Sequence, residues 1–302
     1  YTQGPCVIAA GPGSGKTTVM AVKEAHLLNL GYSPERIVSI TFTNKASAEM
    51  KKRINAITGI PIENFPWIRT IHSFCLHLLK AECTRLGFKA PVSIYGASSQ
   101  KAIMRIVMSQ IGLNKKFLKN TLSMISRAKN SIDPIAYIRS GNHSSQNERT
   151  YNLYEEMLIR NNAVDLDGII LWALKLLRDH EDLRTDIQEY FQYILVDEFQ
   201  DCNDVQNEIL SMIVNNGNFT VVGDDYQSIY SFRGANPGHF INFTNNYENA
   251  GSIFLEENHR CTDVISAASN ALISNNTIQR FKNCFSKKPG VPIECKVFQN
   301  QK

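Results

Sequence analysis

The sequence predicts an α/β fold, in which a parallel β-sheet is covered by helices on both faces and carries an inserted all-helical subdomain. Short, almost continuously apolar stretches alternate with segments of helical spacing, which is typical of parallel strands buried on both faces. These stretches end in polar residues, and ligands of open α/β sheets bind at the carboxyl ends of the strands. One long segment near the middle of the chain has scarcely any strand signal and predicts the insertion.

Five apolar stretches are the expected strands, and they occupy residues 6–10, 37–42, 193–196, 219–222 and 252–255. In the segment between the second and the third, apolar residues recur at helical spacing, as in Ile103-Val107-Ile111. The turn at Pro289-Gly290 leads into another apolar stretch at 291–298, which predicts the opening strand of a new domain. We therefore expect four segments: the first half of the α/β domain at 1–88, the helical insertion at 89–178, the second half of the α/β domain at 179–276, and the start of a second α/β domain at 277–302.

Composition and charge exclude several protein classes. The 302 residues are 43% hydrophobic and 20% charged, which excludes collagen-like and disordered chains, and no apolar run reaches the roughly 18 residues of a membrane helix. Seven cysteines without a CxxC pair predict reduced thiols in a cytoplasmic protein. The net charge of +4 divides into +6 over residues 1–98, +7 over 99–141 and −9 over 142–302, which favours a polyanionic partner.

The strongest signal is a glycine-rich segment directly after the first expected strand. A helical run follows it, and the segment reads Ala10-Gly11-Pro12-Gly13-Ser14-Gly15-Lys16-Thr17-Thr18. Backbone N–H groups of such a loop bind phosphates together with the positive end of the helix, Lys16 reaches the β- and γ-phosphates, and the Thr17 hydroxyl binds Mg²⁺. The segment therefore predicts a P-loop nucleotide site, although Ala10 replaces the usual first glycine.

A second signal is the pair of carboxylates, Asp197 and Glu198, that follows the strand at 193–196. Beside a P-loop, one carboxylate can bind Mg²⁺ and the other can accept a proton from the attacking water. Lys16 and Asp197 are 181 residues apart, far more than a compact nucleotide-binding core needs between these strands. The helical insertion accounts for the excess.

These two segments belong to a series of blocks that resembles the UvrD/Rep/PcrA family of superfamily I DNA helicases. The blocks follow in order along nearly the whole chain, at residues 11–17, 41–46, 70–74, 164–168, 197–201, 223–235 and 255–260. The resemblance implies a RecA-like domain with a helical insertion. It also implies an enzyme that hydrolyses ATP with Mg²⁺, moves along single-stranded DNA with 3′-to-5′ polarity, unwinds DNA at single/double-strand junctions, and acts in DNA repair or replication.

The resemblance assigns roles to residues of the nucleotide site. Asp197 would bind the metal ion and Glu198 would be the general base. Gln227 would sense the γ-phosphate, and Arg260 would stabilise charge on the transferred phosphoryl group. His259 stands where the family usually has an aromatic residue that stacks on adenine.

Other residues of the same blocks are the expected contacts to single-stranded DNA. The rings of Phe42, Tyr230 and Phe232 would stack on bases, an interaction that tolerates any sequence because every base has a π-face. The further expected DNA contacts are Thr43, Asn44, His72 and Arg233.

The chain starts at Tyr1, on the edge of an apolar strand and without a leader, and the family's last motifs are missing. We expect a monomeric fragment without the second motor domain, which folds, binds nucleotide weakly and does not unwind DNA alone.

Three alternatives remain open at this point: a helicase–nuclease subunit of the same superfamily, a P-loop enzyme of another class, and a catalytically idle DNA-binding relative. Asn44-Lys45-Ala46-Ser47 imitates the guanine-reading NKxD motif of GTPases, but Ser47 stands where the base-reading aspartate must be. The presence of Lys16, Asp197, Glu198, Gln227 and Arg260 argues against an idle relative.

Overall fold

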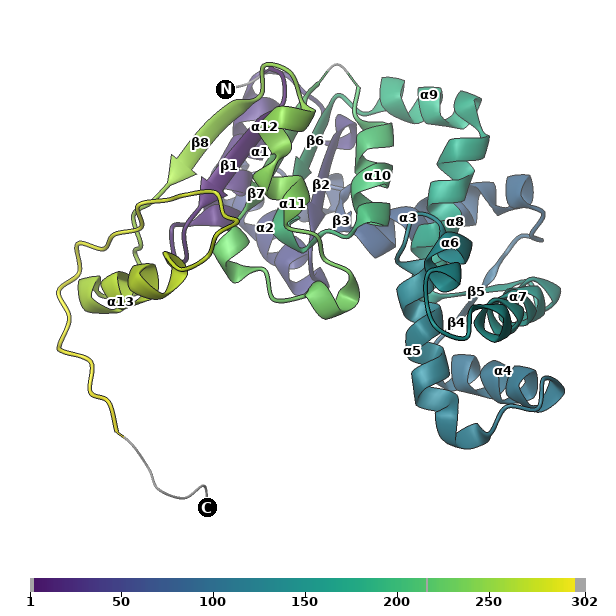
Figure 1. Cartoon of the computed structure of the whole chain (residues 1–302). Coiled ribbons are helices and arrows are strands. Elements are labelled where there is room, and N and C mark those ends of the chain that lie inside the picture. The colour runs from purple at the N-terminus through teal and green to yellow at the C-terminus, as the bar shows by residue number, and fades with distance from the viewer. Residues whose placement is uncertain (1–2, 216, 297–302) are drawn as a thin grey trace.

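A six-stranded parallel sheet forms the centre of the computed structural model, which describes residues 3–215 and 217–296 (Figure 1). All neighbouring strands run parallel. Their spatial order is β3 (Ile68–Thr70), β2 (Ile37–Thr41), β6 (Tyr193–Val196), β7 (Phe219–Gly223), β1 (Cys6–Ala10) and β8 (Gly251–Leu255). The five expected strands are confirmed, and β3 is a further strand whose three residues are too few to show a pattern.

Helices cover both faces of the sheet because successive side chains of a strand point to opposite sides. Cys6, Ile8 and Ala10 of β1 pack with α1 (Lys16–Asn29) and α2 (Asn44–Thr58). Val7 and Ala9 point to the other face. That face is covered by α3 (Ile71–Glu82), α8 (Leu166–Asp179), α9 (Glu181–Tyr190), α10 (Asp204–Ile213), α11 (Gly238–Ile241) and α12 (Phe243–Asn246). The predicted α/β fold with helices on both faces is confirmed.

Two helices begin directly at the carboxyl edge of the sheet, and each has a side-chain cap. Thr43 accepts a hydrogen bond from the Ala46 N–H at the start of α2, and Thr70 accepts one from the Ser73 N–H at the start of α3. Such caps satisfy N–H groups that have no partner within the helix. The two caps stabilise the starts of α2 and α3, where the expected DNA contacts Thr43, Asn44 and His72 lie.

The insertion has its own apolar core, built around Met104, Val107 and Tyr154. Its elements are β4 (Ser93–Tyr95), α4 (Ala97–Gln110), α5 (Leu118–Lys129), α6 (Pro134–Arg139), α7 (Ser144–Arg160) and β5 (Ala163–Asp165). Because β4 and β5 form a two-stranded parallel sheet, the expectation of an all-helical insertion is corrected. Three-residue strands are too short for their alternation to be recognised in the sequence.

A buried ion cluster joins the insertion to α8. The ammonium group of Lys129 lies 2.8 Å from Oδ1 of Asp165 and 2.5 Å from Oε1 of Glu155, and Tyr154 donates to Oδ2 of Asp165. The same Asp165 accepts the Gly168 N–H and so caps α8. A buried charge needs partners of this kind, so the cluster fixes how α5, α7 and α8 meet.

The apolar face of α8 belongs to the core beside the main sheet, although its sequence lies within the expected insertion. Figure 1 shows α4 to α7 gathered at one end of the molecule and α13 (Asp263–Ile273) at the other. The expected boundaries after residues 88, 178 and 276 stay predictions.

The expected strand at 291–298 is not formed in its described part. Residues 291–296 are exposed and have no regular secondary structure, and residues 297 and 298 lie outside the described residues. The segment before them lies against the first domain instead, where Phe285 forms an isolated parallel bridge with Glu257. In the part of the chain that the structure describes, no helix is long and apolar enough to cross a membrane.

Candidate nucleotide and DNA site

The turn between β1 and α1 depends on glycine at two positions. Gly13 and Gly15 have φ angles of +69° and +90°, which other residues rarely adopt. A Cβ atom on Gly13 would also lie 2.6 Å from Oδ1 of Asn258 and 2.8 Å from Cβ of Arg260. The loop can therefore turn tightly and pack directly against the segment at 258–260, whose His259 N–H donates to the Gly13 carbonyl at 3.1 Å.

The first turn of α1 is suited to an anion. Its N-cap residue Gly15 makes no side-chain cap, and the turn contains no acidic residue. Free N–H groups and the helix dipole favour negative charge at such an end, and Lys16 adds an ammonium group. A phosphate group fits this position.

The Asp197 carboxylate lies directly behind the P-loop. Thr17 donates from Oγ1 to Oδ2 of Asp197 at 3.3 Å. Asp197 is only 5% exposed, and this burial, together with the nearby charge of Glu198, raises its pKa to about 6. A cation would offset both effects, and a hydroxyl with a carboxylate is the oxygen donor set that Mg²⁺ prefers. These two residues therefore fit a magnesium ion.

Glu198 is held in an unusual backbone conformation. Its φ angle of 53° lies in the left-handed region, which is costly for a residue with a Cβ and is concentrated at functional sites. Its Oε2 lies 3.5 Å from Nζ of Lys16 and accepts a hydrogen bond from Gln200 at 2.9 Å. The structure thus brings the predicted base beside the predicted phosphate-binding lysine.

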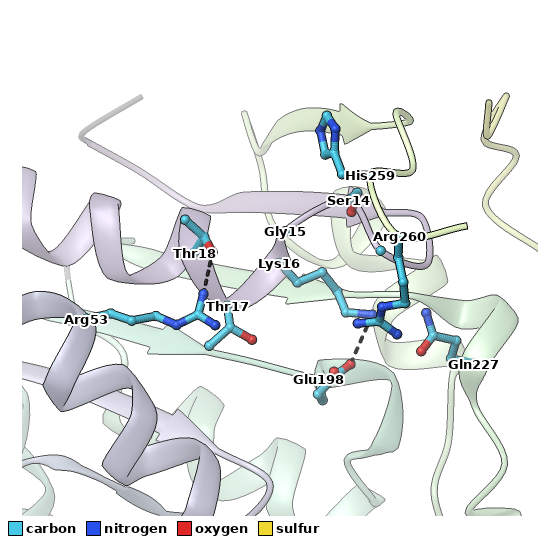
Figure 2. A pocket seen from close by; sticks show the side chains of 11 residues that line it. Ser14, Gly15, Lys16, Thr17, Thr18, Arg53, Glu198, Gln227, His259 and Arg260 are labelled. Atoms are coloured by element: carbon cyan, nitrogen blue, oxygen red, sulfur yellow. Dashed lines mark hydrogen bonds and ion pairs between the residues drawn. The ribbon is translucent and has the colours of Figure 1, made fainter. Parts of the chain in front are cut away.

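The P-loop, the first turn of α1 and Glu198 line a pocket of about 460 Å³ (Figure 2). The predicted residues among its lining are Gly13, Ser14, Gly15, Lys16, Thr17, Thr18, Glu198, Gln227, His259 and Arg260. Four other residues predicted for the nucleotide site are not part of the lining: Ala10, Gly11, Pro12 and Asp197. Ala10 is fully buried as the last residue of β1, so its side chain cannot reach a ligand.

Four of the lining side chains converge. In Figure 2, Lys16, Glu198, Gln227 and Arg260 point toward one another, and His259 points away from them. The His259 side chain is 65% exposed, so its expected contact with adenine stays a prediction. Asn258 orients Arg260, because its Oδ1 accepts the backbone N–H groups of Arg260 and Cys261, each at 2.8 Å.

A hydrogen-bond network connects Gln227 to the acidic block. Nε2 of Gln227 donates to Oδ2 of Asp224 at 2.6 Å. The Asp224 N–H donates to Oε1 of Gln200 at 2.9 Å, and Gln200 also holds Glu198. Hydrogen bonds therefore join the block that follows β6 to the block that follows β7.

Three predicted aromatic residues form a continuous surface. The ring centroids of Phe42 and Tyr230 are 5.0 Å apart, and those of Tyr230 and Phe232 are 5.9 Å apart. Phe42 is 38% and Phe232 is 69% exposed, so two large apolar rings face the solvent. Rings exposed in this way can stack on bases.

The other predicted DNA contacts lie at the same edge of the sheet. Thr43 and Asn44 follow β2 and His72 follows β3, the neighbouring strand, and all three are exposed. Arg233 ends a short helical turn, and its side chain lies outside the described part of the structure. The contacts of these residues with DNA stay predictions.

Comparison with known families agrees with this geometry. A family model described as the UvrD/REP helicase N-terminal domain matches residues 1–248. The chain belongs to the UvrD/Rep helicase family. The resemblance seen in the ordered sequence blocks is thereby confirmed.

Curated relatives in the UvrD/Rep family match most of the chain. The ATP-dependent DNA helicase PcrA of Leuconostoc citreum is 37% identical over 282 residues, 91% of this chain and 38% of the relative. The ATP-dependent DNA helicase Rep of Buchnera aphidicola subsp. Baizongia pistaciae is 36% identical over 291 residues, 95% of this chain and 43% of the relative. PcrA of Staphylococcus aureus is 35% identical over 292 residues, 94% of this chain and 40% of the relative. The chain thus spans about two fifths of the length of these relatives.

One lining residue of this UvrD/Rep-family pocket was not among the sequence predictions. Arg53 on α2 donates to Oγ1 of Thr18 and lies 2.5 Å from Oε1 of Glu49. Nothing in the neighbouring sequence distinguishes Arg53 from Lys51 and Lys52. It reaches the pocket because α2 packs beside α1 on the same face of the sheet, which only the tertiary structure shows.

Proposed function

We propose that this chain forms the nucleotide site and part of the DNA-binding surface of an ATP-dependent DNA helicase. The enzyme couples ATP hydrolysis to 3′-to-5′ movement along single-stranded DNA and to unwinding at single/double-strand junctions. The observation that carries the proposal is the convergence of Lys16, Glu198, Gln227 and Arg260 in one pocket beside the P-loop. The relatives described above are named ATP-dependent DNA helicases, which agrees with it.

The pocket suits a nucleoside triphosphate with Mg²⁺. The first turn of α1, Lys16 and Arg53 supply the positive charge that the phosphates need. Thr17 and Asp197 would hold the metal ion, because their oxygen atoms lie together behind the loop. The ion would neutralise charge on the β- and γ-phosphates.

Hydrolysis needs a base that faces the γ-phosphate. The Lys16 ammonium lies 3.5 Å from the Glu198 carboxylate. Bound phosphates would offer Lys16 a more strongly charged partner, so that Glu198 could accept a proton from water. The water oxygen would bond to the γ-phosphorus atom as the bond to the bridging β-phosphate oxygen breaks, which releases ADP and phosphate. Gln227 and Arg260 then face the transferred group, where Arg260 stabilises its developing charge.

The aromatic surface is the proposed binding site for single-stranded DNA. Phe42 extends from the end of β2, and Tyr230 and Phe232 belong to the segment that contains Gln227. Stacking on these rings requires no particular base, which a protein that moves along DNA needs. Since the segment from Asp224 to Phe232 contacts both the nucleotide pocket and this surface, it can couple the two.

Equilibrium binding tests the proposal. We expect ATP to displace a fluorescent ATP analogue from the 302-residue chain at lower concentration than GTP does. We also expect Lys16→Ala to weaken binding by about 10-fold or more, because a charge-assisted contact to phosphate is lost. Lys175→Ala is a matched control, because Lys175 is exposed on α8 and paired only locally with Asp179.

A preference for GTP, or equal affinity of the Lys16→Ala variant and the parent chain, would contradict the nucleotide assignment. Fluorescence anisotropy of labelled single-stranded DNA tests the second part. Binding should weaken steeply with salt, because Lys and Arg contacts to phosphates release counterions. An affinity independent of salt would contradict the DNA assignment.

A further inference from the structure

After α13 the chain returns to the first domain, and residues 280–285, here named the return segment, attach to two loops of the nucleotide site. The Arg280 N–H donates to Oδ2 of Asp225 at 2.8 Å. The N–H groups of Asn283 and Phe285 donate to the side chain and the carbonyl of Glu256, at 2.6 and 3.0 Å. The return segment therefore connects the loop after β7 with the loop after β8.

Lys282 is the centre of this attachment. The residue is only 2% exposed, and its ammonium group lies 3.1 Å from Oδ1 of Asp224, against Oδ1 of Asp225, and 3.6 Å from the centre of the Tyr226 ring. Its own N–H donates to the Tyr226 hydroxyl at 3.0 Å. A buried ammonium held by two carboxylates and a ring is expensive to displace, so the loop and the segment are firmly joined.

Asp224 divides its two carboxylate oxygens between Lys282 and the nucleotide pocket. Oδ1 lies 3.1 Å from the Lys282 ammonium group and accepts the Tyr226 N–H at 3.2 Å, and Oδ2 accepts from Nε2 of Gln227 at 2.6 Å. Asp224 is fully buried, so water does not compete for either oxygen. Lys282 thus holds the Asp224 carboxylate in place, and this carboxylate positions Gln227. The second Nε2 hydrogen of Gln227 can still donate to a phosphate oxygen, and its Oε1 can accept from a water molecule.

The return segment also supports the opposite wall of the pocket. The backbone N–H of Asn258 donates to the Phe285 carbonyl at 2.7 Å. The side chain of the same Asn258 accepts the N–H of Arg260. Cys284 packs against Gly11, so that a Cβ atom there would overlap its sulfur. Both residues that face the transferred phosphoryl group, Gln227 and Arg260, are therefore held through residues that bind this segment.

We propose that Lys282 is a positioning residue for Gln227, and that the return segment carries the signal that a γ-phosphate is present. The inference rests on the function proposed above, in which the pocket binds ATP. A γ-phosphate bound by Gln227 and Arg260 would alter the hydrogen bonds that these two residues make with Asp224 and Asn258. Both Asp224 and Asn258 also contact the return segment. By thermodynamic reciprocity, a firmly attached return segment favours the nucleotide that has the γ-phosphate.

Amide hydrogen exchange on the unmodified 302-residue chain tests the signal without any substitution. The N–H groups of Arg280, Lys282, Asn283 and Phe285 all donate to the first domain, so detachment would expose them. With Mg²⁺ and saturating nucleotide, we expect ATPγS to slow amide exchange of residues 280–285 and ADP to leave it close to that of the nucleotide-free chain. Both nucleotides should protect the P-loop.

The two proposals fail in different ways in this experiment. If both nucleotides protect the P-loop and residues 280–285 exchange alike with each, or faster with ATPγS, the proposed function stands and this inference is overturned. If neither nucleotide protects the P-loop, the proposed function is overturned and the inference falls with it.

The ratio of the ADP to the ATPγS dissociation constant tests the positioning role. Lys282→Met should lower this ratio by about 10-fold, the effect of one charge-assisted hydrogen bond, and leave ADP affinity unchanged, because ADP lacks the γ-phosphate that Gln227 is proposed to face. Gln227→Ala should have a similar effect, and the double variant should show no further loss. Lys287→Met is the matched control, because Lys287 is 74% exposed and pairs with Glu257 at the surface.

A second variant covers the case in which Lys282→Met does not fold. Asp225→Asn weakens the hold on Lys282 and leaves Asp224 and Gln227 intact, so it should lower the ratio by a smaller factor. An unchanged ratio in a folded Lys282→Met or Asp225→Asn chain would overturn the positioning role. Additive losses in the double variant would also overturn it.

Discussion

A buried carboxyl group on α1 makes stability depend on pH in a direction unusual for an acid. Glu24 is fully buried; its Oε2 accepts a hydrogen bond from Ser39 at 2.5 Å, and its Oε1 has no hydrogen-bond partner among the described residues. Burial raises the pKa of Glu24 to about 7, although the Ser39 hydrogen bond and the charge of Lys51 act in the opposite direction. Folding therefore favours the protonated acid.

The size of the effect follows from the two pKa values. The unfolded chain loses this proton near pH 4.5 and the folded chain near pH 7, so the folded state binds more protons in between. Stability is therefore lost as the pH rises through this range, and the loss is complete above pH 7. At about 1.4 kcal/mol for each pKa unit, the free energy of unfolding should fall by about 3 kcal/mol. Glu24→Gln has no proton to lose, so its stability relative to the parent chain should rise by the same amount.

Urea denaturation at pH 5 and pH 8, followed by the fluorescence of Trp67 and Trp172, measures this difference. Any packing change caused by Glu24→Gln is the same at both pH values and cancels in the comparison. Glu35→Gln is the control, because Glu35 is exposed to water just before β2. If the stability difference between Glu24→Gln and the parent chain were equal at pH 5 and pH 8, the reasoning from burial would be refuted.

Three further predictions concern the proposed reaction. Glu198→Gln should leave the affinity for ATP and Mg²⁺ unchanged and slow phosphate release by about 10²–10⁴-fold, because the amide keeps the shape and cannot accept the proton; weakened binding with retained turnover would contradict this. Arg260→Ala should slow phosphate release more than it weakens ATP binding, because the guanidinium acts on charge that develops during transfer; equal losses would argue against that role. Tyr230→Ala should weaken binding of labelled single-stranded DNA by about 1–3 kcal/mol with the salt slope unchanged, because stacking releases few ions; a smaller slope would show that the residue does not act by stacking.

The features that could be predicted from the sequence are those in which the local chemistry is complete within a few residues. The P-loop has its glycines, its lysine and its hydroxyl in one short segment, and Asp197 and Glu198 are adjacent. The meeting of the P-loop and this carboxylate pair at one place follows from the rule that parallel strands present their carboxyl ends at one edge. The strand order and the paired positions of β1, β7 and β8 provide that edge.

The features that could not be predicted depend on which surfaces pack together. Arg53 belongs to a run of basic residues on α2 and reaches the pocket only because α2 lies beside α1. Lys282 has the sequence context of an exposed lysine, yet it is buried between two carboxylates that lie far from it in the sequence. The apolar residues at 291–298 suggested a strand, but a strand needs a neighbouring strand, and the described residues 291–296 have none.

The position of β1 within the sheet has a consequence for how the protein is synthesised. β1 leads into the P-loop and leaves the ribosome before the other strands described here, but its neighbours in the described sheet are β7 and β8, which begin at Phe219 and Gly251. Until those strands emerge, β1 has two open edges and apolar side chains on both faces, a state that invites mispairing. The insertion, with a core of its own, can fold before they appear. The nucleotide pocket is therefore begun with β1 and is complete only after β8 and residues 258–260 have been made.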